Sequence, residues 1–434
     1  MFFKFLLILL GLLCVIPFPG IAGKAVATSQ YDQETFGSLP SLVQHYLTAP
    51  TSESAELLLP QILNHPDATI PAVSKIIQQS RRDDQQPVGS HPSQDITVRG
   101  RSYSYSLYVP PSYDPAKAYP LIVCLHGAGF TGEGYLDRWV PRLEDRYILV
   151  CPTMSMGAWW RRSAEELILA IIQTIQRRYH VDADRIFLSG MSNGGIGAWI
   201  IGMHHADLFA GIAPMAGGID DVLFPFLENL RLTSVYVIHG VHDQVMPVSL
   251  SRSLVDDMGK RGIEHVYREH TFTHPHAGGH FFPREELPAL VSWFDRQTRR
   301  PISRNVSVIR DATHLSSFSW VQIDATSQIA AFSENLIDKR DALIAEKVYA
   351  TLTADIPSPN HIVVTTEHVR RYSLFLHDAL VDFSRPVKVE TNGQLSFEGI
   401  VTPSLEALLQ EARRRQDPAR LFPVKLTIDV EGGC

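Results

Sequence analysis

Cysteine is scarce in this sequence, and so is any surplus of positive charge. Four cysteines occur among the 434 residues, and Cys14 lies in an apolar N-terminal run, so the rest of the chain can form at most one disulfide. Lysine and arginine total 39 against 46 aspartate and glutamate residues, a formal net charge of -7, which argues against nucleic acid as a partner. Four histidines within residues 270–280 would suit a metal, but the H-E-x-x-H motif and the Cys/His spacings of zinc sites are missing, so we expect no metal site.

The overall composition is that of a soluble globular protein. Hydrophobic residues make up 45% of the chain and charged residues 20%. A chain of 434 residues is long enough for two or three structural units with a large buried core.

The strongest apolar run lies at the N terminus. A single lysine, Lys4, precedes the apolar residues 5–16, and two prolines and a glycine follow them. Because this run is short for a membrane-spanning helix, residues 1–27 are predicted to be a secretory signal peptide that is cleaved before Thr28. We therefore expect a secreted or periplasmic protein with no membrane contact beyond this segment. An uncleaved anchor is the alternative.

The remainder of the chain divides into three parts. Residues 28–90 contain short leucine- and isoleucine-rich stretches separated by prolines, which predict short helices followed by a polar linker within 78–94. Residues 91–300 alternate between strand-like and helix-like stretches. Residues 304–434 are predicted to form a separate β-rich domain of unknown role.

The pattern of residues 91–300 predicts an α/β fold. Continuous apolar runs, typical of strands buried on both faces, occur at 121–125, 147–151, 186–190, 212–215 and 234–238. Helix-like stretches occur at 136–145, 163–178, 248–261 and 285–296. This alternation indicates a mainly parallel sheet with helices on both faces. Residues 96–99 and 103–109 flank Gly100 and are expected to add an antiparallel hairpin at one edge.

Two local features of this part carry further predictions. Ser163 and Glu166 have the spacing of a capping box, which predicts the start of the helix that ends at Arg178. Cys124 and Cys151 fall within predicted buried strands, so we expect them to be small core residues rather than a disulfide.

The C-terminal part shows the pattern of several short strands. These strands are expected at 306–309, 320–323, 362–366, 372–376, 387–390 and 395–400. Asn392-Gly393 is a strong hairpin signal, and a helix is expected at Leu405–Arg414 before a last strand near Val424–Val430. The pattern predicts a sandwich-like domain and contains no motif that indicates a chemical function.

A serine between glycines is the most informative motif. The apolar run at 186–190 stops at Gly190, and Met191, Ser192, Asn193 and Gly194 follow it. A G-x-S-x-G sequence after a strand is typical of a sharp turn that lifts the serine hydroxyl above the sheet. Ser192 is therefore the candidate nucleophile.

A serine hydroxyl needs a base, and the base needs an acid to orient it. Asp243 follows the strand predicted at 234–238, which places it at the carboxyl edge of the sheet, where such sheets build their sites. Further along lies a histidine-rich loop that ends at His280, after two glycines and before two phenylalanines. We take His280 as the base, with His276 as the alternative.

The oxyanion that forms during attack on a carbonyl needs backbone N–H donors. One donor is expected from Asn193, the residue after the nucleophile. The second is expected from Gly127 or Ala128, in the H-G-A-G loop after the strand at 121–125. The side chain of His126 is expected to be structural.

Two adjacent tryptophans precede the helix that is predicted to start near Ser163. Trp159 and Trp160 follow the strand at 147–151 on the same sheet edge, so they are candidate substrate-binding residues that could form an aromatic wall. Buried packing is the competing interpretation for at least one of them.

Taken together, residues 121–129 and 190–195, Asp243 and His280 resemble an α/β-hydrolase. Closer similarity is to feruloyl esterases and polyhydroxyalkanoate depolymerases, and to esterases like dienelactone hydrolase and prolyl oligopeptidase. Their G-x-S-x-G and H-G-x-G motifs match here as G-M-S-N-G-G and H-G-A-G. The resemblance covers about residues 96–297 and implies an α/β-hydrolase fold and a serine esterase without a cofactor.

The expected activity is cleavage of carboxylic esters, in small molecules or polymers, through an acyl-enzyme. A serine peptidase of the prolyl-oligopeptidase type would use the same three residues and is one alternative. A non-catalytic surface-binding protein that acts through its C-terminal domain is the other. The sequence carries no signal for acyl-chain length or oligomeric state.

Overall fold

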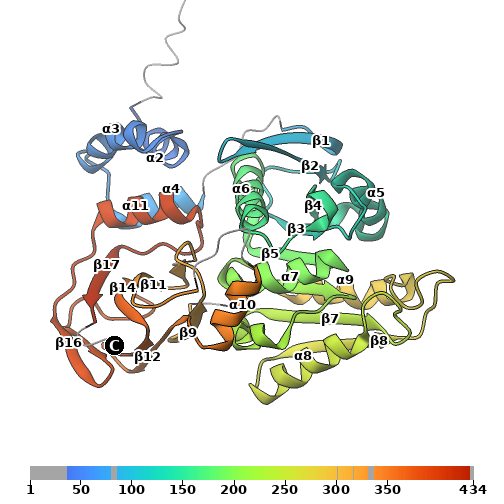
Figure 1. Ribbon diagram of the computed structural model, residues 1–434. Coiled ribbons are helices and arrows are strands. Elements are labelled where there is room, and N and C mark those ends of the chain that lie inside the picture. The colour runs from blue at the N-terminus through green and yellow to red at the C-terminus, as the bar shows by residue number, and fades with distance from the viewer. Residues whose placement is uncertain (1–36, 80–85, 301, 316, 331–336, 431–434) are drawn as a thin grey trace, which may run out of the picture.

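The computed structural model describes residues 37–79, 86–300, 302–315, 317–330 and 337–430. Figure 1 shows an α/β body beside a β-rich body that is topped by the N-terminal helices. The predicted signal peptide, residues 1–27, and Cys434 lie outside the described residues. Across the described part of the chain, no helix combines the length and the apolar character needed to cross a membrane.

An eight-stranded sheet forms the centre of the α/β body, in the order β1-β2-β4-β3-β5-β6-β7-β8. Its strands are β1 (Gly89–Val98), β2 (Arg101–Val109), β3 (Tyr119–Leu125), β4 (Ile148–Pro152), β5 (Val181–Met191), β6 (Gly211–Met215), β7 (Ser234–Gly240) and β8 (His265–His270). The β1-β2 and β2-β4 pairings are antiparallel and the other pairings are parallel. The mainly parallel sheet and its edge hairpin are therefore confirmed.

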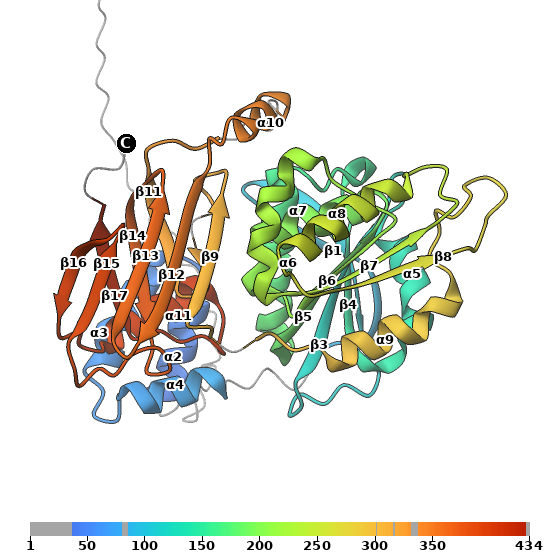
Figure 2. The same ribbon diagram turned by 90° about the horizontal axis from the view of Figure 1, so that it is seen from below.

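Helices cover both faces of this sheet. They are α5 (Gly132–Leu143), α6 (Arg162–Arg178), α7 (Asn193–His204), α8 (Val248–Lys260) and α9 (Leu287–Arg296), with a 3-10 segment η4 (Asp221–Leu232). Leu121, Val123 and Leu125 of β3 join the apolar cluster of α6, α7 and α8, whereas Ile122 and Cys124 join that of α5 and α9. Figure 2 shows these helices on opposite sides of the sheet. Burial on both faces explains the uninterrupted apolar runs of the central strands.

Cys124 and Cys151 both lie in the second of these clusters as free, buried thiols, as predicted. Burial raises the pKa of the Cys151 thiol, and the adjacent Cys124 raises it further. A thiol whose pKa is raised stays protonated and unreactive at neutral pH. These cysteines therefore act as small core residues.

The start of α6 and the linker before β1 differ from the predictions. The helix begins at Arg162 after Arg161, without a side-chain cap, so Ser163 does not form the predicted capping box. The Glu166 carboxylate instead accepts from Arg162 at 2.8 Å and pairs with Arg99 at 3.0 Å. β1 begins at Gly89, so the last residues of the predicted linker belong to this strand. Residues 80–85 of the predicted linker lie outside the described part of the chain.

β8 has no counterpart among the predicted strands. It forms the edge of the sheet, and its residues Arg268 and Glu269 form ion pairs with Glu286 and Arg252. Edge strands commonly carry charges, which protect them from pairing with other chains. Because its sequence is polar, β8 could not be recognised as a strand. It leads directly into the histidine-rich loop.

The β-rich body consists of two sheets. One has the order β10-β11-β14-β17 and the other β16-β15-β13-β12-β9. The strands are β9 (Asn305–Arg310), β10 (Ser317–Phe318), β11 (Val321–Thr326), β12 (Ala350–Ser358), β13 (His361–Glu367), β14 (Val369–Leu376), β15 (Val387–Thr391), β16 (Gln394–Gly399) and β17 (Val424–Asp429), with helices α10 (Ile337–Ala345) and α11 (Leu405–Arg415). Asn392-Gly393 joins β15 and β16 in the predicted hairpin. Figure 2 shows the strands as a two-layered, sandwich-like body.

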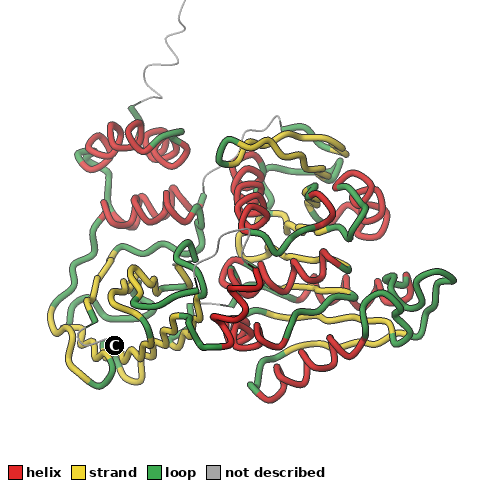
Figure 3. Tube along the Cα trace, in the orientation of Figure 1, coloured by secondary structure: helices red, strands yellow, loops and turns green. Residues whose placement is uncertain are grey.

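The N-terminal helices pack on this β-rich body. The helices α2 (Leu39–Thr48), α3 (Ser52–Leu63) and α4 (Ile70–Gln78) share one apolar cluster with Leu408 and Leu409 of α11. The Arg413 side chain donates to the backbone oxygens of Tyr46 at 2.7 Å and Ala49 at 2.8 Å. Figure 3 shows α11 lying next to these helices. Although the sequence suggests an independent N-terminal segment, its apolar faces are covered by residues more than three hundred positions later.

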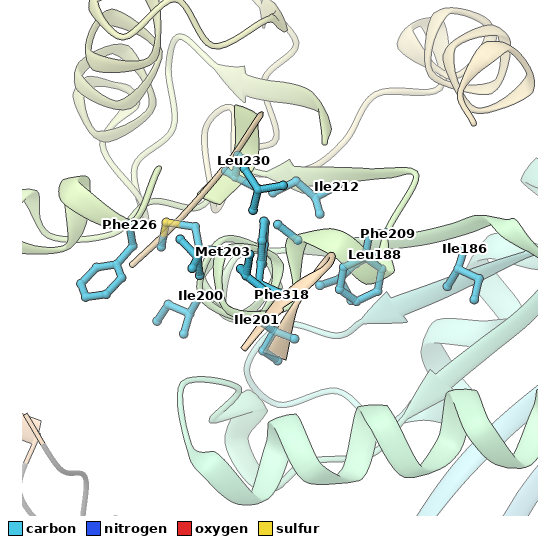
Figure 4. Packing of buried hydrophobic residues seen from close by; sticks show 14 of the residues in the cluster. Ile186, Leu188, Ile200, Ile201, Met203, Phe209, Ile212, Phe226, Leu230 and Phe318 are labelled. Atoms are coloured by element: carbon cyan, nitrogen blue, oxygen red, sulfur yellow. The ribbon is translucent and has the colours of Figure 1, made fainter. Parts of the chain in front are cut away.

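The α/β body and the β-rich body share a buried interface. Phe318 is 3% exposed and lies near Ile201 and Met203 of α7, as Figure 4 shows. The side chain of Asn229 donates to the Ile309 backbone oxygen at 3.1 Å and accepts from its N–H at 2.8 Å. The β-rich body is therefore fixed to the α/β body by apolar packing and by hydrogen bonds.

A group of histidine and carboxylate side chains lies at this interface. His204, the last residue of α7, contacts the Glu165 carboxylate through Nδ1, and its Nε2 lies 3.6 Å from Asp311 Oδ1. His314 Nε2 lies 3.2 Å from the other Glu165 oxygen, and His205 Nε2 lies 3.6 Å from it. We call these five residues the interdomain cluster.

The pKa values in the interdomain cluster follow from burial and pairing. Burial alone would lower the pKa of His204, but Glu165 and Asp311 raise it. Burial alone would raise the pKa of Glu165, but His204 and its histidine neighbours lower it below the ordinary value. The cluster therefore favours a charged histidine beside a charged carboxylate.

Candidate active site

Ser192 lies in a strained turn between β5 and α7. Its backbone has a φ of 60° and a ψ of -123°, a conformation that non-glycine residues rarely adopt. A Cβ on Gly190 would lie 2.2 Å from the Gly194 backbone oxygen, and a Cβ on Gly194 would lie 2.0 Å from the Leu125 oxygen. The two glycines are therefore required by close backbone packing, which holds Ser192 at the top of the sheet.

Asn193 is the first residue of α7, directly after Ser192. The first N–H groups of a helix have no partner within the helix and carry partial positive charge. The Asn193 side chain donates to the Met156 backbone oxygen at 2.9 Å, which ties the helix start to the loop after β4. This arrangement suits the role expected of the Asn193 backbone N–H.

Asp243 lies three residues after the end of β7, at the carboxyl edge of the sheet. Its Oδ2 accepts a hydrogen bond from His280 Nδ1 at 2.8 Å. Its Oδ1 accepts from the backbone N–H groups of Val245 and Met246, both at 2.8 Å. The structure thus brings the predicted acid and the predicted base into direct contact and fixes the orientation of the carboxylate.

His239, for which the sequence predicts no role, also contacts the aspartate. Its Nε2 lies 3.2 Å from Asp243 Oδ2 and 2.9 Å from the Met246 backbone oxygen, and its Nδ1 lies 2.7 Å from Ser251 Oγ. Because both partners of Nε2 are acceptors, this nitrogen carries a proton. The sequence motif H-G-V-H-D places His239 four residues before Asp243, but the contact depends on the loop conformation.

The carboxylate of Asp243 is fully enclosed, with 0% side-chain exposure. Burial alone would raise its pKa, but hydrogen bonds from His239, His280 and the backbone N–H groups of Met246 and Val245 lower it below the ordinary value of 3.8. Asp243 is therefore ionised at neutral pH. An ionised partner holds the His280 proton on Nδ1 and leaves Nε2 free to accept a proton.

The histidine loop and the Asp243 loop approach each other at glycines. A Cβ on Gly278 would lie 2.0 Å from the His242 backbone oxygen, and a Cβ on Gly240 would lie 2.0 Å from the Gly279 oxygen. This close approach explains the glycine pair before His280. It also fixes His280, which is 6% exposed, whereas His276 lies exposed on the outer part of the loop.

Ser192, Asp243 and His280 all follow strands of one parallel set. β5 and β7 flank β6, so their carboxyl ends meet at the same edge of the sheet. The hydrogen bonds of the described residues join His280 to Asp243 but do not include one from the Ser192 hydroxyl to His280. The roles of the three residues therefore remain a proposal based on their placement.

The loop after β3 lies directly beside the serine. A Cβ on Gly127 would lie 3.3 Å from the Ser192 Cβ, so the glycine lets the backbone approach the candidate nucleophile. His126 holds this loop, because its Nδ1 donates to the Gly127 oxygen at 2.8 Å and its Nε2 accepts from the Met154 N–H at 3.1 Å. The backbone of Gly127 thus lies beside Ser192, and the second oxyanion donor from Gly127 or Ala128 stays a prediction.

Trp159 does not have the role expected of it. The side chain is 0% exposed, and its indole N–H donates to the His126 backbone oxygen at 2.8 Å. Its Cβ lies against α7, where a Cβ on Gly197 would approach it to 2.3 Å. Trp159 therefore packs in the core and supports the loop of His126. Trp160 is half-buried and keeps its assignment as a prediction.

Comparison with known proteins shows that part of the chain is similar to esterases. Residues 96–246 match the family model described as "Putative esterase". The "Probable feruloyl esterase C" of Aspergillus terreus is 25% identical over 186 residues, which cover 41% of this chain and 66% of that protein. Feruloyl esterase C of Emericella nidulans is 27% identical, over 37% of this chain and 63% of that protein. The chain resembles the α/β-hydrolase serine esterases.

The esterase match includes Ser192 and Asp243 and ends before His280. The alignments with the two fungal relatives span about two thirds of their length or less. Among solved structures, a thermostable esterase is 27% identical and covers 48% of this chain and 63% of its own, with a TM-score of 0.41. A ferulic acid esterase from Anaeromyces mucronatus is 18% identical and covers 50% and 94%, with a TM-score of 0.37.

Proposed function

We propose that this chain is a serine hydrolase that cleaves carboxylic esters through an acyl-enzyme, with Ser192 as nucleophile, His280 as base and Asp243 as orienting acid. The observation that carries the proposal is the 2.8 Å hydrogen bond between His280 Nδ1 and the buried Asp243 carboxylate, at the sheet edge that also presents Ser192. This combination supplies both the proton acceptor and the strained serine that acyl transfer requires.

In the first step, His280 Nε2 accepts the hydroxyl proton as Ser192 Oγ attacks the ester carbonyl carbon. The positive charge that develops on the imidazole is stabilised by Asp243, whose pKa is lowered by its hydrogen bonds. The carbonyl oxygen becomes an oxyanion. It accepts hydrogen bonds from the backbone N–H of Asn193 and from the N–H groups of the Gly127-Ala128 loop.

In the second step, the carbon–oxygen bond to the alcohol breaks, and the proton on His280 Nε2 passes to the leaving oxygen. Water then replaces the alcohol, and His280 accepts a proton from it as it attacks the acyl carbon. The return of that proton to Ser192 Oγ releases the carboxylic acid. Every proton transfer uses the same imidazole, so the tautomer set by Asp243 is needed throughout.

Turnover of 4-nitrophenyl acetate by the wild type and by Ser192→Ala tests this proposal. We expect Ser192→Ala to lower kcat/KM by about 10⁵-fold or more, with an unchanged thermal unfolding midpoint. His276→Ala is the matched control on the same loop and should keep wild-type activity. Retained turnover in Ser192→Ala would exclude the nucleophile assignment.

The alternatives from the sequence predict different results. A peptidase of the prolyl-oligopeptidase type would cleave aminoacyl 4-nitroanilides faster than the corresponding aryl esters after correction for intrinsic reactivity. A non-catalytic binding protein would hydrolyse neither the aminoacyl 4-nitroanilides nor the aryl esters. Location outside the cytoplasm remains a prediction from the apolar run at residues 5–16.

A further inference from the structure

A cavity of 460 Å³ lies between α5 and the segment around His280. Aromatic side chains line one part of it, among them Phe281 and Phe272, which is 45% exposed. Three arginines, Arg138, Arg142 and Arg284, line another part. A chain with a net charge of -7 thus places three positive charges at this cavity.

Within the described part of the chain, the three guanidinium groups have no carboxylate partner. Over the described residues, no ion pair and no hydrogen bond involves the side chain of Arg138, Arg142 or Arg284. Glu285 is the carboxylate in the cavity lining and is exposed, and it too forms no ion pair among the described residues. Most other arginines near the sheet have such partners, for example Arg252 with Glu269 at 2.7 Å.

The helix geometry holds two of these charges close together. Arg138 and Arg142 are four residues apart on α5, so their side chains emerge on the same face, and like charges at this spacing repel. The Arg138 guanidinium lies 4.5 Å from the centre of the Phe130 ring. This cation–π contact stabilises the guanidinium but does not neutralise its charge. Burial lowers the pKa of Arg142, and the charges of Arg284 and Arg138 lower it further. A bound anion would relieve this repulsion.

Two residues of the cavity lining link it to segments of the candidate active site. On one side, the Arg138 guanidinium contacts the ring of Phe130, which lies two residues after Ala128. On the other side, the Phe281 ring lies 5.9 Å from the His280 ring. Because His280 must reach the leaving oxygen to protonate it, a cavity lined by the residues that directly follow His280 is suited to the alcohol part of the ester.

We propose that this cavity binds the alcohol part of the substrate and that Arg138, Arg142 and Arg284 recognise a carboxylate on it. The substrate class is then an ester of an acidic, aromatic or sugar-like alcohol. The aromatic side chains contact the ring, and the guanidinium groups hold the carboxylate by charge-assisted hydrogen bonds. This inference rests on the proposed esterase activity and adds a specificity to it.

Hydrolysis of 4-acetoxybenzoate and of 4-acetoxybenzamide tests the inference, because the two esters share the acetyl group and differ in the charge on the alcohol. Each kcat/KM is divided by the rate of hydroxide-catalysed hydrolysis, which removes the difference in leaving-group reactivity. We expect the wild type to favour the anionic ester by about tenfold or more through a lower KM, at low salt. The double variant Arg138→Gln, Arg142→Gln should lower this ratio to about one.

Arg385→Gln is the control, because Arg385 is an exposed arginine of the β-rich body and its substitution changes the net charge without touching the cavity. It should keep the wild-type ratio. A wild-type ratio of one or less would overturn the inference, and so would an equal loss in Arg385→Gln. Labelling of Ser192 by a fluorophosphonate separates this failure from failure of the esterase proposal, since labelling does not require an anionic alcohol.

Discussion

Two buried histidine–carboxylate pairs lie at opposite ends of one helix. His280 and Asp243 lie at the sheet edge beside Ser192, which immediately precedes α7. His204 ends α7 and contacts Glu165 in the interdomain cluster. Both pairs are less than 10% exposed and both carboxylates have a lowered pKa. Burial and pairing are therefore shared by the two pairs.

The surroundings of the two pairs differ. Asp243 is oriented by two backbone N–H groups and by His239, while His280 directly precedes residues that line a cavity whose three arginines have no carboxylate partner among the described residues. Glu165, in contrast, is surrounded by three histidines contributed by both bodies of the molecule. A buried histidine–carboxylate pair is thus a candidate catalytic unit when it lies at the same sheet edge as a nucleophile. A pair stabilises the structure instead when both ring nitrogens of its histidine face carboxylates.

The substitution Asp243→Asn gives the largest effect that separates the two pairs. We expect kcat/KM for an aryl ester to fall by about 10⁴-fold, because an amide no longer favours the Nδ1-protonated tautomer of His280 or stabilises its charged form. The oxygen of the introduced amide can still accept from the N–H groups of Val245 and Met246, so the fold should persist. A loss below tenfold would mean that Asp243 does not orient the base.

The matching change in the interdomain cluster, Glu165→Gln, should act on stability instead. Removal of the charge leaves His204 buried without its main partner, and we expect the free energy of unfolding to fall by about 3 kcal/mol. The kcat/KM of the folded protein should stay within about twofold of wild type. Glu166→Gln is the control, since this neighbour is 20% exposed and its loss should cost about 1 kcal/mol or less. Lost activity without lost stability would contradict the structural role.

The two pairs also respond to pH in opposite directions. The pKa of His204 is raised in the folded protein, so the charged form of this histidine stabilises the fold. This stabilisation is complete below pH 6.5 and is lost as the pH rises through the folded-state pKa of His204. The pKa of Asp243 is lowered in the folded protein, so its ionised form stabilises the fold. This stabilisation is present above pH 3.8 and is lost as the pH falls through the folded-state pKa of Asp243. Urea unfolding at pH 6 and pH 9 should therefore show a decrease in wild-type stability at pH 9. This decrease should be smaller in His204→Gln, and an equal decrease in both proteins would remove His204 as its source.

The sheet and the turn of Ser192 could be predicted because their signals are local. Alternate residues of β3 face two different helix layers, which produces a continuous apolar run, and close backbone packing requires the glycines around Ser192. Asp243 could be proposed from its position after a predicted strand, and His280 from its position after two glycines in the histidine-rich loop. Their hydrogen bond supports that pairing.

The features that could not be predicted depend on contacts between distant segments. β8 was missed because its edge position favours charges, and the packing of α2 on α11 joins opposite ends of the chain. The sequence left open which of the two tryptophans is buried, and it is Trp159, because glycine at position 197 lets α7 pack against the Trp159 side chain. The arginine-lined cavity draws its charges from α5 and from the segment after His280, so no single stretch of sequence reveals it.

Mass spectrometry of the protein after reaction with a fluorophosphonate tests the central claim most directly. We predict one adduct, located on the peptide that contains Ser192, at a rate that falls strongly in His280→Ala and is unchanged in His276→Ala and Glu165→Gln. An unlabelled wild-type protein, or an adduct on another serine, would contradict the assignment of the catalytic centre to the turn between β5 and α7.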